Sequence, residues 1–131
     1  MNREIEIFSK VENICTIEKL IDEVSEELKI SSDLYGKILI SSIEGINNSI
    51  VHGNKNDERK KVRFSIQKIK NKIKIFIEDQ GRGFDFNNVP DPTKPENIEN
   101  ISGRGIFLMK KLADEIYFHN NGSKIELIFI V

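Results

Sequence analysis

The stretch IEGINNSIVHGN, residues 43–54, organises the chain and has the pattern of the end of an amphipathic helix. Its isoleucines repeat at helical spacing and form an apolar stripe. Glu44, Asn48 and His52 follow one another at intervals of four residues, so they project from one side of the same helix. From the helix alone two interpretations stay open. One is a functional face with a general base and a metal ligand, and the other is an ordinary polar face near a fraying end.

Length and composition are those of a soluble globular protein. The chain has 131 residues, 38% hydrophobic and 31% charged, which predicts one domain over residues 1–131 with a single core. The net charge of −1 gives no bias toward nucleic acid or a membrane, so we expect neither partner. No run reaches the roughly 18 apolar residues of a membrane span and none resembles a signal peptide, which favours a cytoplasmic protein. Cys15 lies among apolar helix positions and is expected to be buried.

Residue periodicity predicts the element order β-α-α-β-β-loop-α-β-β. The helix that carries the opening stretch begins near Leu34, after the N-cap candidates Ser31-Ser32-Asp33, and ends at about His52. The other predicted elements are strands at 4–8, 62–69, 73–79, 116–119 and 124–131, a helix from a Ser9–Glu12 capping box to Leu28, and a short helix at 106–113. Because the helices fall in the middle of the order, we expect an α+β fold, a mixed sheet with helices on one face.

Asp79 ends the second strand of the predicted hairpin, in register with the inward-facing isoleucines of that strand. Because strand side chains alternate, its carboxyl group should point to the core side, where an unpaired carboxylate is costly. Two partners stay open: the exocyclic amino group of a ligand, or the turn that follows the strand. Gly81 and Gly83 would allow close approach of the backbone to a flat ligand.

Residues 85–102 hold three prolines and no clear periodicity. A loop of this length inside a compact domain is usually a lid or another functional loop, and is otherwise disordered. It leads to Gly103-Arg104-Gly105 ahead of the short helix. Free N–H groups and the positive end of the helix dipole favour an anion there, and the Arg104 guanidinium suits a terminal phosphate. The alternative is a flexible loop end, which a lone Gly-x-Gly does not exclude.

In this order the three pieces resemble the nucleotide-binding boxes of the GHKL (histidine kinase-like) ATPase superfamily. They are Glu-x-x-x-Asn-x-x-x-His on a helix, Asp-x-Gly-x-Gly-Phe after a strand, and Gly-x-Gly at a helix start. The short length and Asn-His-Gly character of the first box resemble the anti-sigma-factor serine kinases of the RsbW and SpoIIAB type. The resemblance covers nearly the whole chain and implies a Bergerat ATP-binding fold, a two-layer α/β sandwich with a mostly antiparallel sheet. Asn47 and Asn54 depart from the pattern, since Thr and an aromatic residue are commoner there.

Carried over residue by residue, the resemblance implies a role for each box, with ATP and Mg²⁺ as cofactors. Glu44 matches the general base, Asn48 the Mg²⁺ ligand, Asp79 the residue that binds the adenine amino group, Gly81 and Gly83 the adenine pocket, residues 85–102 the lid, and Gly103, Arg104 and Gly105 its phosphate-binding end. For His52 we expect only a structural hydrogen bond near the site.

The function that the resemblance implies is an ATP-dependent serine/threonine protein kinase that is also an anti-sigma factor. It would phosphorylate a STAS-type anti-sigma-factor antagonist in a partner-switching circuit, with a sigma factor as its other partner, and would form a homodimer. The alternative is a non-catalytic module that binds ATP or ADP and sequesters a protein partner.

Overall fold

The computed structural model describes residues 1–82 and 101–131 and confirms the predicted order of elements. The elements are β1 (Asn2–Phe8), η1 (Val11–Asn13), α1 (Ile14–Leu28), α2 (Ser32–Asn48), η2 (Ser49–Gly53), β2 (Lys61–Ile69), β3 (Lys72–Glu78), α3 (Ile101–Leu112), β4 (Glu115–His119), η5 (Asn120–Gly122) and β5 (Lys124–Ile130). The predicted lid, residues 85–102, lies outside the described residues except for its last two, which belong to α3. Gly83 also lies outside them.

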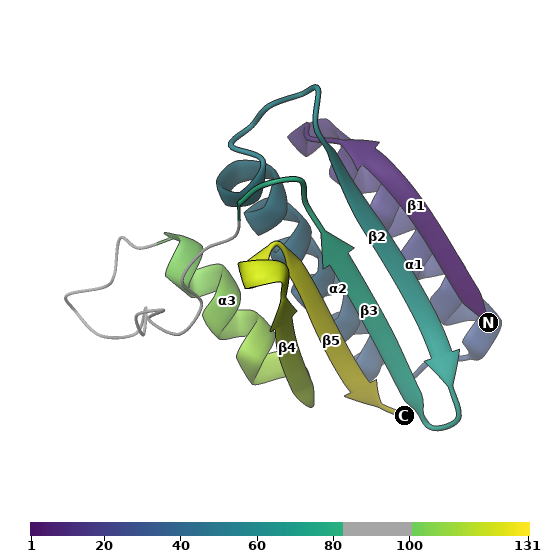
Figure 1. Cartoon of the computed structure of the whole chain (residues 1–131). Helices are drawn as coiled ribbons and strands as arrows, with labels where there is room; N and C mark the ends of the chain where they lie inside the picture. The colour runs from purple at the N-terminus through teal and green to yellow at the C-terminus, as the bar shows by residue number, and fades with distance from the viewer. Residues whose placement is uncertain (83–100) are drawn as a thin grey trace.

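The five strands form one sheet in the order β1-β2-β3-β5-β4, and neighbouring strands pair antiparallel throughout. The expected mixed sheet is therefore corrected to an antiparallel one, while the α+β class is confirmed. The connections explain the difference. Two helices that run in opposite directions join β1 to β2, so the chain returns to the end where β1 finished (Figure 1). A single crossover helix would have placed β2 parallel to β1.

The helices cover one face of the sheet, and the core lies between the two layers (Figure 1). Strand residues of one parity point toward the helices, as the period of two requires. The buried side chains include Val62, Phe64 and Ile66 of β2, Ile73, Ile75 and Ile77 of β3, Ile125, Leu127 and Phe129 of β5, Ile14, Ile17, Ile21 and Val24 of α1, and Ile38, Ile46 and Ile50 of α2. Each fully buried side chain of this size contributes about 1.5–3 kcal/mol to folding.

Charged side chains occupy much of the opposite face of the sheet. Arg63 lies within 3.2–3.8 Å of three carboxylates, those of Glu4, Glu6 and Glu78, on the two neighbouring strands. Each such exposed pair adds only about 0–1 kcal/mol. Arg63 belongs to the lysine- and arginine-rich β2–β3 hairpin, so a basic side chain of this hairpin is paired with carboxylates on the outer face of the sheet.

Two helix starts differ in how the backbone is capped. The predicted cap of α2 is confirmed, because the Ser31 hydroxyl accepts a hydrogen bond from the Leu34 N–H at 3.2 Å. The predicted capping box at Ser9 is wrong. The Ser9 hydroxyl instead donates to the Lys60 carbonyl at 2.8 Å, so it ties the end of β1 to the segment before β2.

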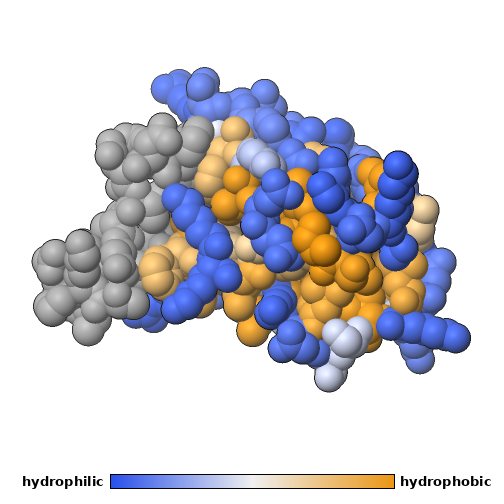
Figure 2. Space-filling model, turned by 90° about the horizontal axis from the view of Figure 1, so that it is seen from below, coloured by the Kyte–Doolittle hydropathy of each residue, from blue (hydrophilic) through white to orange (hydrophobic). Residues whose placement is uncertain are grey.

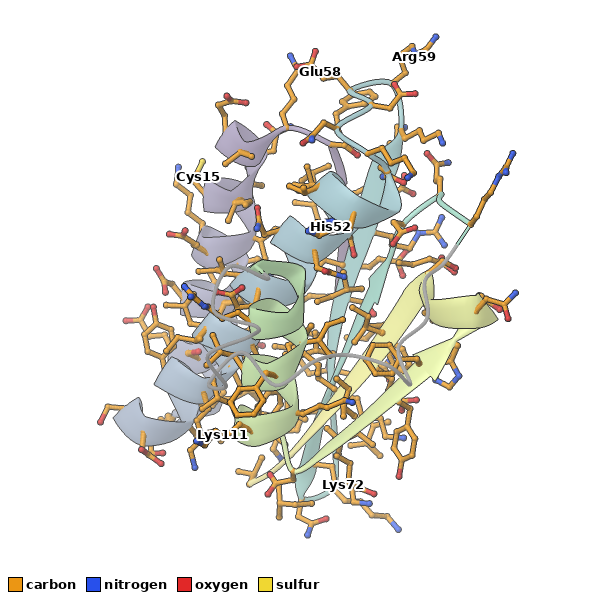
Figure 3. All side chains as sticks on the ribbon, turned by 90° about the vertical axis from the view of Figure 1, so that its left-hand side faces the viewer. Cys15, His52, Glu58, Arg59, Lys72 and Lys111 are labelled. Carbon is orange, nitrogen blue, oxygen red and sulfur yellow. The ribbon has the colours of Figure 1, made fainter. Side chains whose placement is uncertain are left out.

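Cys15 is exposed, contrary to the prediction (Figure 3). Ile14, Ile17 and Ile21 form the stripe of α1 that faces the sheet. Position 15 lies about 100° around the helix from position 14 and therefore leaves that stripe.

Hydrophobic side chains gather on the end of the molecule where both termini lie (Figure 2). Exposed apolar residues of this end include Met1, Ile69, Ile130 and Val131. The end of α2, the end of β3 and the start of α3 meet at the opposite end (Figure 1). Among the described helices, none has the length and apolar content needed to cross a bilayer.

Candidate functional site

The helix that carries the opening stretch changes its winding where the site begins. It is α-helical to Asn48 and continues as the π-helical turn η2, in which the Asn54 N–H donates to the Ser49 carbonyl five residues back at 2.8 Å. Glu44 and Asn48 therefore share one face of the α-helix, as predicted. His52 lies on the wider turn, out of line with them, and is exposed (Figure 3). Its predicted structural hydrogen bond is not seen among the described residues. Turns of this kind inside helices are frequent at functional sites.

Glu44 lies beside the start of α3. A Cβ atom added to Gly105 of α3 would stand 3.1 Å from Glu44 Oε2. One residue further along α2, a Cβ on Gly45 would overlap the Ile77 side chain and lie 3.3 Å from the Met109 sulfur. These two glycines therefore permit α2 to approach α3 and β3 closely enough to bring the boxes together.

Asp79 occupies the position that strand alternation predicts, and its side chain is only 8% exposed. Its backbone N–H donates to the Ser123 carbonyl of the neighbouring segment at 2.9 Å. Its Oδ1 accepts a hydrogen bond from the Gly81 N–H at 2.7 Å. The turn-capping interpretation is thus confirmed, and the carboxyl group is also buried, as strand alternation predicts.

Burial raises the pKa of the Asp79 carboxyl group above its usual value. The Gly81 N–H is the strongest opposing influence on this pKa, the nearby Glu78 charge raises it further, and Lys60 and the Ser49 hydroxyl lower it. Ser49 is itself buried, and its Oγ forms no hydrogen bond of normal geometry with the described residues. The charged form of Asp79 therefore lacks full compensation within the described residues, which suits a group that accepts a hydrogen bond from a ligand.

Two glycines enclose this carboxylate. A Cβ on Gly53 would overlap the Asp79 carboxyl group, and a Cβ on Gly81 would overlap the Gly53 carbonyl oxygen. Any side chain at either position would fill the space beside the carboxylate. The role predicted for Gly81 has this geometry in its favour, whereas Gly53 was not among the predicted site residues. The Gly53-Asn54 pair just after the predicted end of the helix is the signal in the sequence that could have pointed to Gly53.

The start of α3 differs from the prediction. The helix begins at Ile101, five residues before the expected start, so Gly103, Arg104 and Gly105 lie inside its first turns. The first N–H groups of the helix, those of residues 101–103, have no acceptor within it, whereas those of Arg104 and Gly105 fall within the helical ladder. The N–H groups suited to an anion are therefore those of residues 101–103, ahead of Arg104 and Gly105, and the positive end of the helix dipole lies near Glu44.

Asn48 offers a carboxamide one helical turn after Glu44 and is 7% exposed. Among the described residues, no group of three or more histidine, cysteine or acidic side chains is arranged so that it could hold a metal ion. Mg²⁺ prefers oxygen ligands, keeps several waters and takes only one or two protein ligands when it also binds phosphates. The donor set therefore fits a magnesium ion that arrives with a nucleotide better than a resident metal.

A separate hollow of about 430 Å³ lies between α1 and α2, away from these residues. It is lined by Asp22, Ser25, Glu26, Ile30, Ser32 and Tyr35. It contains none of the predicted site residues, so its size does not make it the candidate site.

Comparison with known proteins gives a consistent result. Residues 7–129 match the family described as the histidine kinase-like ATPase domain. The serine-protein kinase RsbW of Bacillus subtilis is 22% identical over 124 residues, which cover 90% of this chain and 78% of the relative. RsbW of Staphylococcus epidermidis is 33% identical over 100 residues, 70% of this chain and 62% of the relative. RsbW of Bacillus cereus is 26% identical over 126 residues, 91% of this chain and 78% of the relative.

Proposed function

This chain belongs to the family of histidine kinase-like ATPase domains, and we propose that it transfers the γ-phosphoryl group of ATP to a serine or threonine of a partner protein. The observation that carries the proposal is the convergence of three distant segments. Glu44 lies against the start of α3, and the Asp79 carboxylate lies between Gly53 and Gly81.

The base of the nucleotide binds at Asp79 in this proposal. Its buried carboxylate accepts a hydrogen bond from the 6-amino group of adenine, while Gly81 leaves room for the ring. The raised pKa of Asp79 supports this role, because a donor from the ligand compensates the charge that burial disfavours.

The phosphates lie between Asn48 and the first turn of α3. Asn48 would hold Mg²⁺ through its carboxamide oxygen, and the N–H groups at the start of α3 would bind the terminal phosphate together with Arg104. Bound Mg²⁺ neutralises negative charge on the phosphate oxygens. Phosphoryl transfer depends mainly on this kind of positioning and charge stabilisation, which is why few residues suffice.

Glu44 acts as the general base. Its carboxylate accepts the proton of the attacking hydroxyl while the new P–O bond forms to the substrate oxygen and the bond to the β-phosphate oxygen breaks, which releases ADP. The half-buried position of Glu44 beside α3 supports this role, because the carboxylate then lies next to the proposed phosphate site.

For the partners, the names of the relatives point to serine-containing protein substrates. With the resemblance stated above, we propose a STAS-domain anti-sigma-factor antagonist as the phosphate acceptor and a sigma factor as the second partner. A homodimer is the proposed assembly.

Glu44→Ala tests the kinase role. We expect it to keep ATP affinity within about threefold and to lower the transfer of labelled phosphate to a STAS antagonist by about 10²- to 10⁴-fold, the usual contribution of a general base. Glu18→Ala, which removes an exposed carboxylate of α1, serves as the control and should transfer at the wild-type rate. Transfer at the wild-type rate by Glu44→Ala would contradict the role of Glu44. A wild-type protein that binds ATP and modifies no partner would support the binding module instead.

A further inference from the structure

We propose that Asn54 is a positioning residue that sets the selectivity of the site for adenine by holding the turn formed by Asp79, Gln80 and Gly81. This inference rests on the proposed function, because it assigns a role in the recognition of the same nucleotide. Asn54 stands where the family resemblance leads us to expect an aromatic residue, so the device belongs to this chain rather than to the general pattern.

The Asn54 side chain uses both its acceptor and its donors. Asn54 is 1% exposed. Its Oδ1 accepts a hydrogen bond from the Gln80 backbone N–H at 2.8 Å. Its Nδ2 donates to the Ser9 hydroxyl at 2.8 Å and to the Lys61 carbonyl at 3.0 Å. These partners also fix which way the carboxamide faces, because a backbone N–H can only donate and a carbonyl can only accept.

Asn54 thereby joins four segments that meet beside the site. They are the end of η2, which Asn54 directly follows, the segment after β1, the start of β2, and the turn after β3. The Gln80 side chain adds a return contact, since its Oε1 accepts a hydrogen bond from the Lys61 N–H at 2.7 Å. Asn54 and Ser9 are both buried, so removal of the Asn54 side chain would leave several groups without a partner in a water-poor setting.

The turn after β3 is held by two consecutive backbone N–H groups. That of Gln80 donates to Asn54, and that of Gly81 donates to the Asp79 carboxylate. Gly53, the residue before Asn54, packs against the same carboxylate. Asn54 therefore fixes the turn relative to η2, and with it the direction of the free oxygen of Asp79. Recognition of a single amino group depends on such placement to within about 0.5 Å.

A purely structural role for Asn54 makes a different prediction. Loss of folded protein or of general rigidity would weaken the binding of all nucleotides alike. Loss of the placement of Asp79 would weaken only those that present a 6-amino group. Purine riboside 5′-triphosphate differs from ATP by hydrogen in place of that group, so the ratio of the two dissociation constants isolates the contact.

The experiment is calorimetry with both nucleotides in millimolar Mg²⁺ on the full chain. We expect the wild type to prefer ATP by about tenfold, and Asn54→Ala to lose about tenfold in ATP affinity with little change for purine riboside triphosphate, so that the ratio approaches one. Ser9→Ala removes the far partner of Asn54 and should keep the ratio. The proposal would be overturned if Asn54→Ala kept the wild-type ratio of the two dissociation constants.

Gln80 provides a second pair of variants, in case Asn54→Ala does not fold. Gln80 is exposed. Gln80→Pro removes the backbone N–H that donates to Asn54 Oδ1, whereas Gln80→Ala keeps this N–H. We expect the proline variant to lose the preference for ATP over purine riboside triphosphate and the alanine variant to retain it. Equal ratios of the two dissociation constants in both variants would reject the role of Asn54. A wild type that gives no heat with ATP would reject the proposed function itself, which is a distinct outcome.

Discussion

The carboxyl group of Asp79 loses most of its contact with water on folding and, among the described residues, accepts a hydrogen bond from the Gly81 N–H. Burial is the largest influence on its pKa and raises it. The folded state therefore binds a proton more readily than the unfolded state does, and ionised Asp79 destabilises the fold at pH values above the raised pKa. As the pH falls through the raised pKa toward 3.8, the ordinary value, this destabilisation is lost.

Asp79→Asn should therefore be more stable than the wild type at pH 7, and the difference should shrink as the pH approaches 4. The physical reason is that the amide keeps an acceptor for the Gly81 N–H without a buried charge. Urea denaturation at both pH values measures the change. The same variant should lose ATP affinity by tenfold or more if Asp79 binds the adenine amino group.

Asp57 serves as a control, because its pKa is shifted in the opposite direction to that of Asp79. Hydrogen bonds from the Arg59 side chain and backbone lower the pKa of Asp57 to about 2. The stabilisation from this pair is present above the ordinary pKa of 3.8 and is lost as the pH falls through about 2. Asp57→Asn should accordingly be less stable than the wild type at pH 7. A loss of stability at pH 7 in Asp79→Asn as well would contradict the account of its burial.

At the scale of elements, the junction of α2 and η2 brings a helix, a strand end and a second helix into contact through glycines. The effect of adding a methyl group to a glycine depends on the surroundings of that glycine. A Cβ at Gly36 of α2 would meet no atom within 4 Å, whereas one at Gly81 would overlap the Gly53 carbonyl oxygen. The same chemical change should therefore have opposite consequences at the two positions.

We expect Gly36→Ala to stabilise the protein by about 0.5–1 kcal/mol, since alanine restricts the unfolded chain and favours the helix. Gly81→Ala should destabilise it by about 1–3 kcal/mol, since backbone atoms cannot yield as a side-chain end can, and should weaken nucleotide binding. Thermal unfolding and calorimetry of the two variants check both signs. Stabilisation by Gly81→Ala would show that the turn after β3 adapts easily.

The early start of α3 illustrates why local patterns misplace element ends. Residues 101–105 read Ile-Ser-Gly-Arg-Gly, a sequence with weak intrinsic helix propensity, and we expected the helix to begin after them. The structure extends α3 to Ile101, and Gly105 then lies against Glu44 of α2. Packing between the two helices outweighs the local preference, which propensity alone does not reveal.

For the whole molecule, bound nucleotide should raise the stability of the fold. A ligand present at about 100 times its dissociation constant and bound only to the folded state adds about 2.7 kcal/mol. ATP with Mg²⁺ should therefore raise the melting temperature by several degrees, and EDTA should remove most of the gain from the phosphates. Asp79→Asn should show little shift with either addition. An equal shift with GTP in the wild type would contradict selection of adenine at Asp79.

Periodicity along the chain was enough to identify the main helices and strands, their order and most of the side chains that face the core. Repeats of 3.6 and 2 residues are local properties. The burial of Ile17 in α1 and of Ile75 in β3 can therefore be predicted from their neighbours in sequence. The alternation in β3 also placed Asp79 on the core side. In the same way, the separation of four residues between Glu44 and Asn48 was sufficient to place them on one face of the helix.

Only the tertiary structure decided the sheet order β1-β2-β3-β5-β4, the antiparallel pairing and the partners of the buried polar groups. Asn54 meets Ser9 across 45 residues of chain and Gln80 across 26. Hydrogen bonds between such distant residues follow no local period, because they depend on how the layers close around them. The sequence alone therefore determined which residues carry the three motifs, and the closing of the layers determined which residues touch Asp79.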